Sequence, residues 1–138
     1  MFSTEQLIWF GGLIHLSLLS ASFSVPFVLD WEKELAPLSP FLRRLFWVYG
    51  AFIVLVIVGF GVLSILNAES LSNGTSISRL FCAFVAVFWT FRLTIQCFVF
   101  DIRALCLARW VRAGYHTLTV AFVTLVLIYG GAALGLYP

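Results

Sequence analysis

The chain has 138 residues, of which 62% are hydrophobic and only 10% are charged, and its formal net charge is +2. A soluble domain carries about 25% charged residues, so this composition excludes a water-soluble globule and indicates a protein whose solvent is the lipid bilayer. The small net charge, without any basic run, excludes a nucleic-acid-binding tail. The length suits one domain that covers residues 1–138.

Four apolar segments predict four transmembrane helices, over about residues 7–29, 45–66, 77–100 and 113–136. Each has roughly the 20 residues that a helix needs to cross a hydrocarbon core about 30 Å thick. The stretch before the first segment, MFSTEQ, contains no Lys or Arg, which favours a retained helix over a cleaved signal peptide. We therefore expect an all-α fold, an integral-membrane four-helix bundle.

The connections between these segments carry their own signals. In the first, Ser39 and Pro40 are typical of an N-cap followed by the first residue of a helix, so the second helix is predicted to start before its apolar run. In the second, Asn73 and Gly74 predict the tip of a turn. The third, DIRALCLARWVR, contains no helix breaker, and it is expected either to continue the third helix or to lie in the headgroup layer.

The basic residues predict the orientation, because cytoplasmic loops of membrane proteins carry an excess of Lys and Arg. Arg79 is the one basic residue near the second connection. The first and third connections together hold six: Lys33, Arg43, Arg44, Arg103, Arg109 and Arg112. We expect these two connections in the cytoplasm and both termini on the non-cytoplasmic side.

The third segment carries a polar stripe, since Trp89, Arg92 and Gln96 share one face of a helix. Placing Arg92 at this depth costs about 2.5–3.5 kcal/mol on insertion scales, so partners are expected. The acidic residues of the chain are all predicted at membrane edges, and Asp101 is expected on the opposite face of the helix. Three kinds of partner stay open for Arg92: carbonyls and hydroxyls of the chain, a carboxylate of a partner protein, or a ligand.

Three further side chains are candidates for the same ligand site. His15 is predicted in the first helix, and Tyr115 and His116 towards the cytoplasmic end of the fourth. The predicted depths of the two histidines differ by roughly 13 Å at 1.5 Å per residue, which disfavours a haem held by both. A quinone, a lipid, or a haem held in another way is the expected class of ligand, in a site formed by Arg92, Gln96, Trp89, His15, His116 and Tyr115.

The residues do not form a pattern that is typical of an enzyme or a metal site. No Ser-His-Asp set shares one depth, and the three cysteines lack CxxC spacing and are predicted at three depths. A proton-coupled carrier would be expected to hold a carboxylate within the membrane, and this chain is predicted to have none. The sequence therefore predicts no catalytic residue and no metal ligand.

Gly131 and Gly135 have the GxxxG spacing that lets helices approach closely in lipid. Packing within the bundle is the favoured interpretation, and a homo-oligomer interface is the alternative.

The run Trp89-x-x-Arg92-Leu93-x-x-Gln96, followed by Gly114-Tyr115-His116 and Tyr129-Gly130, resembles a group of small bacterial four-helix membrane proteins. The resemblance covers most of the chain and implies a bacterial inner (cytoplasmic) membrane, but it brings no function, ligand or catalytic residue with it.

Three functional hypotheses follow from these observations. The first is a non-enzymatic membrane protein whose intramembrane polar pocket, with Arg92, Gln96 and His15, binds a lipophilic ligand. The second is an accessory structural subunit of a larger membrane complex, with Arg92 paired to a partner chain. The third is a small oligomeric transporter or anion path.

Overall fold

The computed structural model describes residues 1–99 and 109–138. The helices in these residues are α1 (Thr4–Val28), α2 (Trp31–Leu35), α3 (Pro40–Leu66), α4 (Ala68–Ser72), α5 (Ser76–Phe98) and α6 (Arg109–Leu134). Four of them, α1, α3, α5 and α6, are long and apolar enough to cross a membrane. The predicted all-α fold with four such helices is confirmed, and it indicates a multi-pass membrane protein.

Helix α3 begins where the capping signal predicted. The Ser39 hydroxyl accepts a hydrogen bond from the Leu42 backbone N–H at 3.3 Å, and Pro40 is the first helical residue. Proline suits this position because its missing N–H would have no partner in the first turn. Helix α3 therefore begins with a turn that carries Arg43 and Arg44 before its continuous apolar run.

The second connection is more ordered than the expected loop. Residues 68–72 form the short helix α4, and only then does the chain turn, at Asn73 and at Gly74, whose φ is +66°. Thr75 caps α5 by accepting a hydrogen bond from the Ser78 N–H at 3.2 Å. Of the predicted third connection, residues 101–108, including Asp101, Arg103 and Cys106, lie outside the described residues.

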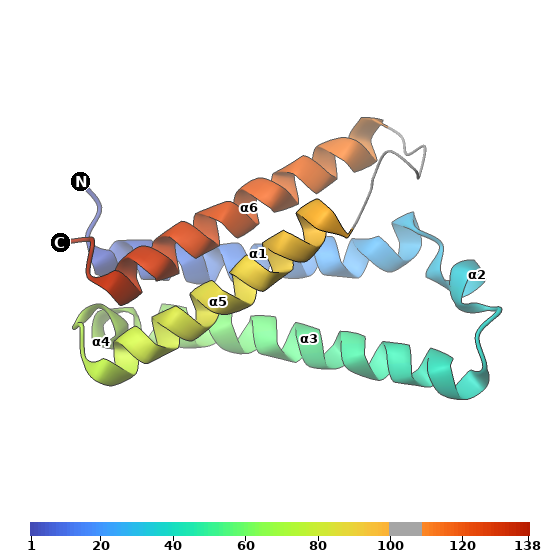
Figure 1. Ribbon diagram of the computed structural model, residues 1–138, viewed down its shortest axis with the longest axis horizontal. Coiled ribbons are helices and arrows are strands. Elements are labelled where there is room, and N and C mark those ends of the chain that lie inside the picture. The colour runs from blue at the N-terminus through green and yellow to red at the C-terminus, as the bar shows by residue number, and fades with distance from the viewer. Residues whose placement is uncertain (100–108) are drawn as a thin grey trace.

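The long helices pack as two pairs, α1 with α3 and α5 with α6, which contacts between α1 and α6 join together. Both termini lie at the end of the molecule that also carries α4, and the Thr4 N–H donates to the Pro138 carbonyl at 2.9 Å. Towards the opposite end, which carries α2, helices α3 and α6 diverge (Figure 1). The bundle is thus closed at the end with the termini and wider at the end with α2.

Glycines allow the close packing at the closed end. A Cβ atom on Gly12 would lie 2.7 Å from Ile65 Cγ1 and 3.0 Å from the Gly61 carbonyl oxygen, so α1 and α3 touch almost backbone to backbone. A side chain at either glycine would force the two helices apart.

The two glycines with GxxxG spacing act within the chain. Gly135 has a φ of +68° and ends α6, where the Leu136 N–H donates to the Gly131 carbonyl at 2.9 Å, as in a Schellman cap. A Cβ atom on Gly131 would overlap the ring of Tyr137. Both residues are therefore explained by packing and capping inside one chain, the interpretation that the sequence favoured.

Candidate ligand-binding cavity

A cavity of about 550 Å³ lies between α1, α3, α5 and α6 in the half of the molecule that faces α2. Its volume is within the range of about 300–1,000 Å³ that is typical of small-molecule sites. The lining residues are Leu18, Ala21, Ser22, Phe23, Val25, Pro26, Trp31, Trp47, Gly50, Ala51, Ile53, Val54, Ile57, Phe88, Trp89, Arg92, Leu118 and Phe122. Among the lining residues that the structure describes, Arg92 is the one charged side chain, and the walls are otherwise mostly apolar.

The guanidinium of Arg92 lies against an aromatic stack at the inner end of the cavity, which is the end away from α2. Its Cζ atom is 5.2 Å from the centre of the Phe122 ring, and the Phe122 ring stacks on Trp89 with centroids 4.9 Å apart and planes inclined by 27°. Arg92 also takes part in interactions beyond this ring contact. A guanidinium has five N–H donors, so it can bond to protein groups and to a ligand at the same time.

His15 holds Trp89 in place from behind the cavity wall. The Trp89 Nε1–H donates to His15 Nε2 at 2.8 Å, and His15 Nδ1 lies 2.7 Å from the Gly11 carbonyl oxygen. This geometry requires a neutral imidazole with its proton on Nδ1, because Nε2 accepts and the carbonyl can only accept. The imidazole is completely buried, and its edge contacts the rings of Phe60, Trp89 and Tyr129.

A second buried hydrogen bond closes the neighbouring part of the core. The Tyr129 hydroxyl donates to Ser64 Oγ at 2.6 Å, which joins α6 to α3, while the His15–Trp89 bond joins α1 to α5. The Tyr129–Ser64 bond lies on the closed side of the cavity, since the Tyr129 ring also covers Gly11. It is next to the His15–Trp89 bond, because the rings of His15 and Tyr129 are in contact with centroids 5.5 Å apart.

Gln96 joins α5 to α6 and does not line the cavity. Its amide nitrogen donates to Thr119 Oγ1 at 2.7 Å and to the Tyr115 carbonyl at 3.3 Å. The Tyr115 hydroxyl in turn donates to the backbone carbonyl of Gln96 at 2.6 Å. These bonds give the buried amide nitrogen of Gln96 two partners on α6 and connect α5 to α6 in both directions.

The structure thus separates the six residues that the sequence placed in one site. Arg92 and Trp89 line the cavity, His15 supports Trp89, and Gln96 and Tyr115 hold α5 against α6. His116 is exposed on α6, where its ring contacts that of Tyr115. His15 and His116 have no contact residue in common among the hydrogen bonds and ring contacts described above. Both nitrogens of His15 already have partners, so this geometry does not suit a haem held through His15.

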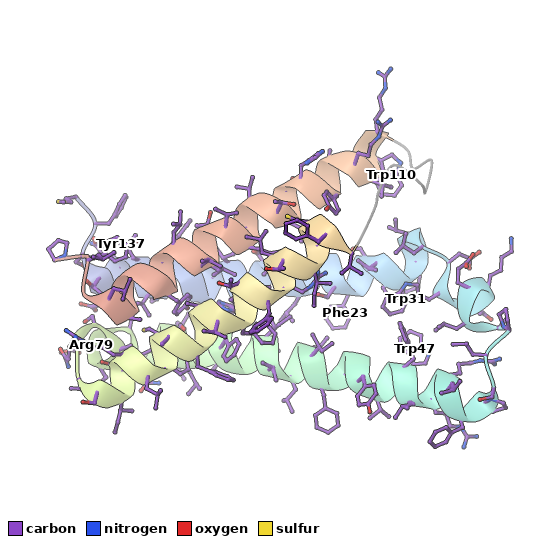
Figure 2. The ribbon with its side chains drawn as sticks, in the orientation of Figure 1. Phe23, Trp31, Trp47, Arg79, Trp110 and Tyr137 are labelled. Atoms are coloured by element: carbon purple, nitrogen blue, oxygen red, sulfur yellow. The ribbon has the colours of Figure 1, made fainter. Side chains whose placement is uncertain are left out.

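Aromatic side chains gather at the α2 end of the cavity. The Trp31 ring meets the rings of Phe46 and Trp47 with centroids 4.9 and 5.7 Å apart. In the view of Figure 2, Phe23, Trp31 and Trp47 lie between α1 and α3, with Trp31 and Trp47 towards the α2 end. Phe23 and Ile53 line the cavity and are also more than half exposed, so the cavity wall continues into the outer apolar surface.

The sequence interpretation missed Phe122, Trp31 and Trp47 as parts of this site. Trp31 and Trp47 carried a signal, because tryptophans near basic residues are typical of the membrane interface, but nothing in the sequence brings the two together. Phe122 was one of 15 phenylalanines in an apolar chain and carried no signal. Comparisons with models of known protein families, with curated proteins and with solved structures give no match, so the site is interpreted from its geometry.

Proposed function

We propose that this protein is a non-enzymatic integral membrane protein that binds a lipophilic ligand in the cavity between α1, α3, α5 and α6. The observation that carries the proposal is the combination of mostly apolar walls with a single lining guanidinium, that of Arg92. Ligand sites are typically apolar, with a few polar groups that set the orientation of the ligand. Arg92 would donate to the polar head of the ligand, and the apolar walls would hold its body.

We further propose that the α2 end of the bundle faces the cytoplasm of a bacterial cell and that both termini lie outside. Support comes from the basic residues, because Lys33, Arg43, Arg44 and Arg109 belong to segments at the α2 end, whereas Arg79 is at the end with the termini. This distribution follows the excess of Lys and Arg on the cytoplasmic side of membrane proteins.

Substitution of Arg92 tests the proposed binding function. The full chain and its Arg92→Leu variant would be purified in a mild detergent and compared by native mass spectrometry and absorption spectroscopy. The expected result is a lipid-sized added mass on the unmodified chain that is absent from the variant. The matched control is Arg79→Leu, the same change at the opposite end, which should keep the added mass.

Other outcomes would refute the proposal. If Arg92→Leu is as stable as the unmodified chain and retains the same molecules, Arg92 does not hold a ligand. A second protein that co-purifies with the unmodified chain and is lost with Arg92→Leu would instead support an accessory subunit. Flux of a solute in liposomes that depends on Arg92 would support a transporter. A haem-like absorption band would keep the binding function but would contradict the interpretation that His15 is not available to a haem.

A further inference from the structure

We infer that the cavity binds a quinone-type molecule, with its flat carbonyl-bearing head at the inner end and its apolar tail towards the outer surface. The inference rests on the proposed function and narrows its ligand class. It depends on three features: how deep the guanidinium of Arg92 lies, which groups surround it, and where the cavity meets the bilayer.

The depth follows from contacts between neighbouring helices. The level of Arg92 is given by the hydrogen bond between Trp89 of α5 and His15 of α1, two helices that run in the same direction (Figure 1). About one turn further along both helices, Arg92 is therefore level with about Leu18 of α1. Val28, the last residue of α1, is ten positions beyond Leu18, or roughly 15 Å at 1.5 Å per residue, and the Trp31 ring that follows α1 contacts Trp47.

The side chain of Arg92 does not shorten this distance by extending towards the α2 end. Its Cζ atom packs on the ring of Phe122, and that ring stacks on Trp89, which precedes Arg92 on α5. With Trp47 at the headgroup level, as is typical of interfacial tryptophans, the guanidinium lies near the middle of a hydrocarbon core about 30 Å thick.

This depth separates the possible lipophilic ligands. A phospholipid in its usual orientation has its phosphate at the level of Trp47 and only acyl chain at the level of Arg92. A quinone has a small head that is soluble in the hydrocarbon core, and its carbonyl oxygens can accept from a guanidinium without bringing a second charge into the membrane. The position of Arg92 therefore favours the quinone.

The groups around the guanidinium also favour a flat ring. Trp89, Phe88 and Phe122 all line the inner end of the cavity, and aromatic rings gain about 0.5–1.5 kcal/mol from stacked or edge contacts beyond the burial of their area. The apolar tail has a route out, because Phe23 and Ile53 belong both to the cavity wall and to the exposed surface. A quinone could thus enter from the bilayer.

A pair of glycine variants on α3 tests this inference. Gly50 lines the cavity and Gly59 does not, and a Cβ atom on either would have no neighbour within 4 Å among the described residues. Gly50→Leu should therefore fill part of the cavity, while Gly59→Leu makes the same chemical change elsewhere on the helix. Binding would be measured as the rise in the thermal unfolding midpoint with a short-tailed benzoquinone, oleate and phosphatidylglycerol as separate probes.

We expect the benzoquinone to stabilise the unmodified chain and Gly59→Leu at concentrations at least tenfold below those needed with the other two probes. For Gly50→Leu, its affinity should fall by about tenfold or more, which is the effect of about 1.4 kcal/mol. If oleate or phosphatidylglycerol binds more tightly than the benzoquinone, and its binding is weakened by Gly50→Leu, the quinone inference fails and the proposed binding function stands. If none of the three binds, both fail.

A photoreactive benzoquinone provides a second test, on the unmodified chain, that does not depend on how a variant folds. After illumination, the labelled peptides should come from α5 and α6 around Trp89 and Phe122, because the head is inferred to lie there. Labelling confined to Trp31 and Trp47 would place the head at the membrane interface and would overturn the inference.

Discussion

Removing the imidazole of His15 is expected to destabilise the bundle through one specific atom, the indole nitrogen of Trp89. In His15→Phe a ring of similar size keeps the edge contacts with Phe60 and Tyr129. The Gly11 carbonyl still accepts the helical N–H of residue 15. Only the Trp89 Nε1–H, which donates to His15 at 2.8 Å in a fully buried site, loses its acceptor.

The expected loss of stability can be bounded from both sides. An unsatisfied buried donor costs about 1–3 kcal/mol in soluble proteins. In membrane proteins, double-mutant cycles of interhelical hydrogen bonds average about 0.6 and reach about 1.7 kcal/mol, because the unfolded chain in lipid also finds partners. The His15–Trp89 bond is short and completely buried, so we expect a loss of about 1–2 kcal/mol, which corresponds to roughly a 5–30-fold change in the unfolding equilibrium.

A double-mutant cycle with Trp89→Phe isolates this bond, because the volume lost with the indole is common to both arms of the cycle. Reversible unfolding of the two single variants and the double variant in detergent micelles gives the coupling energy, expected at about 0.6–1.7 kcal/mol. The control is His116→Phe, the same substitution at an exposed histidine, which should change stability little. A coupling energy indistinguishable from zero would refute the hydrogen bond as a stabilising contact.

Two further predictions concern the helix contacts that shape the cavity. Gly12→Leu should destabilise the bundle by about 1–3 kcal/mol, because an overpacked contact forces backbone shifts and a Cβ atom at this position would lie 2.7 Å from Ile65 Cγ1. Gly59→Leu is the control, and equal unfolding midpoints for the two variants would contradict the close packing of α1 on α3. Gln96→Leu should weaken the α5–α6 contact by about 0.6–1.7 kcal/mol through loss of the bond to Thr119, and an unchanged unfolding equilibrium would contradict this role.

Much of the fold could be predicted because its signals are local. A run of about 20 apolar residues can satisfy its backbone in lipid only as a helix or in a closed barrel, so the four apolar runs indicated the four long helices. Ser39 and Pro40 act on the N–H groups directly beside them, and the start of α3 followed from those two residues. An even number of spans also implied that both termini share one end of the bundle, where Thr4 meets Pro138.

The candidate site depended on contacts between distant segments. Trp89, Arg92 and Gln96 share a helix face by periodicity, but this face is wide enough to meet two neighbours, so Arg92 lines the cavity while Gln96 bonds to α6. The partner of His15 lies 74 positions along the chain, and no local pattern encodes that pairing. The sequence by itself determined which segments are helical and apolar, because a lipid solvent requires apolar side chains and internally bonded backbone. Only the tertiary structure decided how the helices rotate and diverge, because the close packing of side chains from distant segments fixes those orientations.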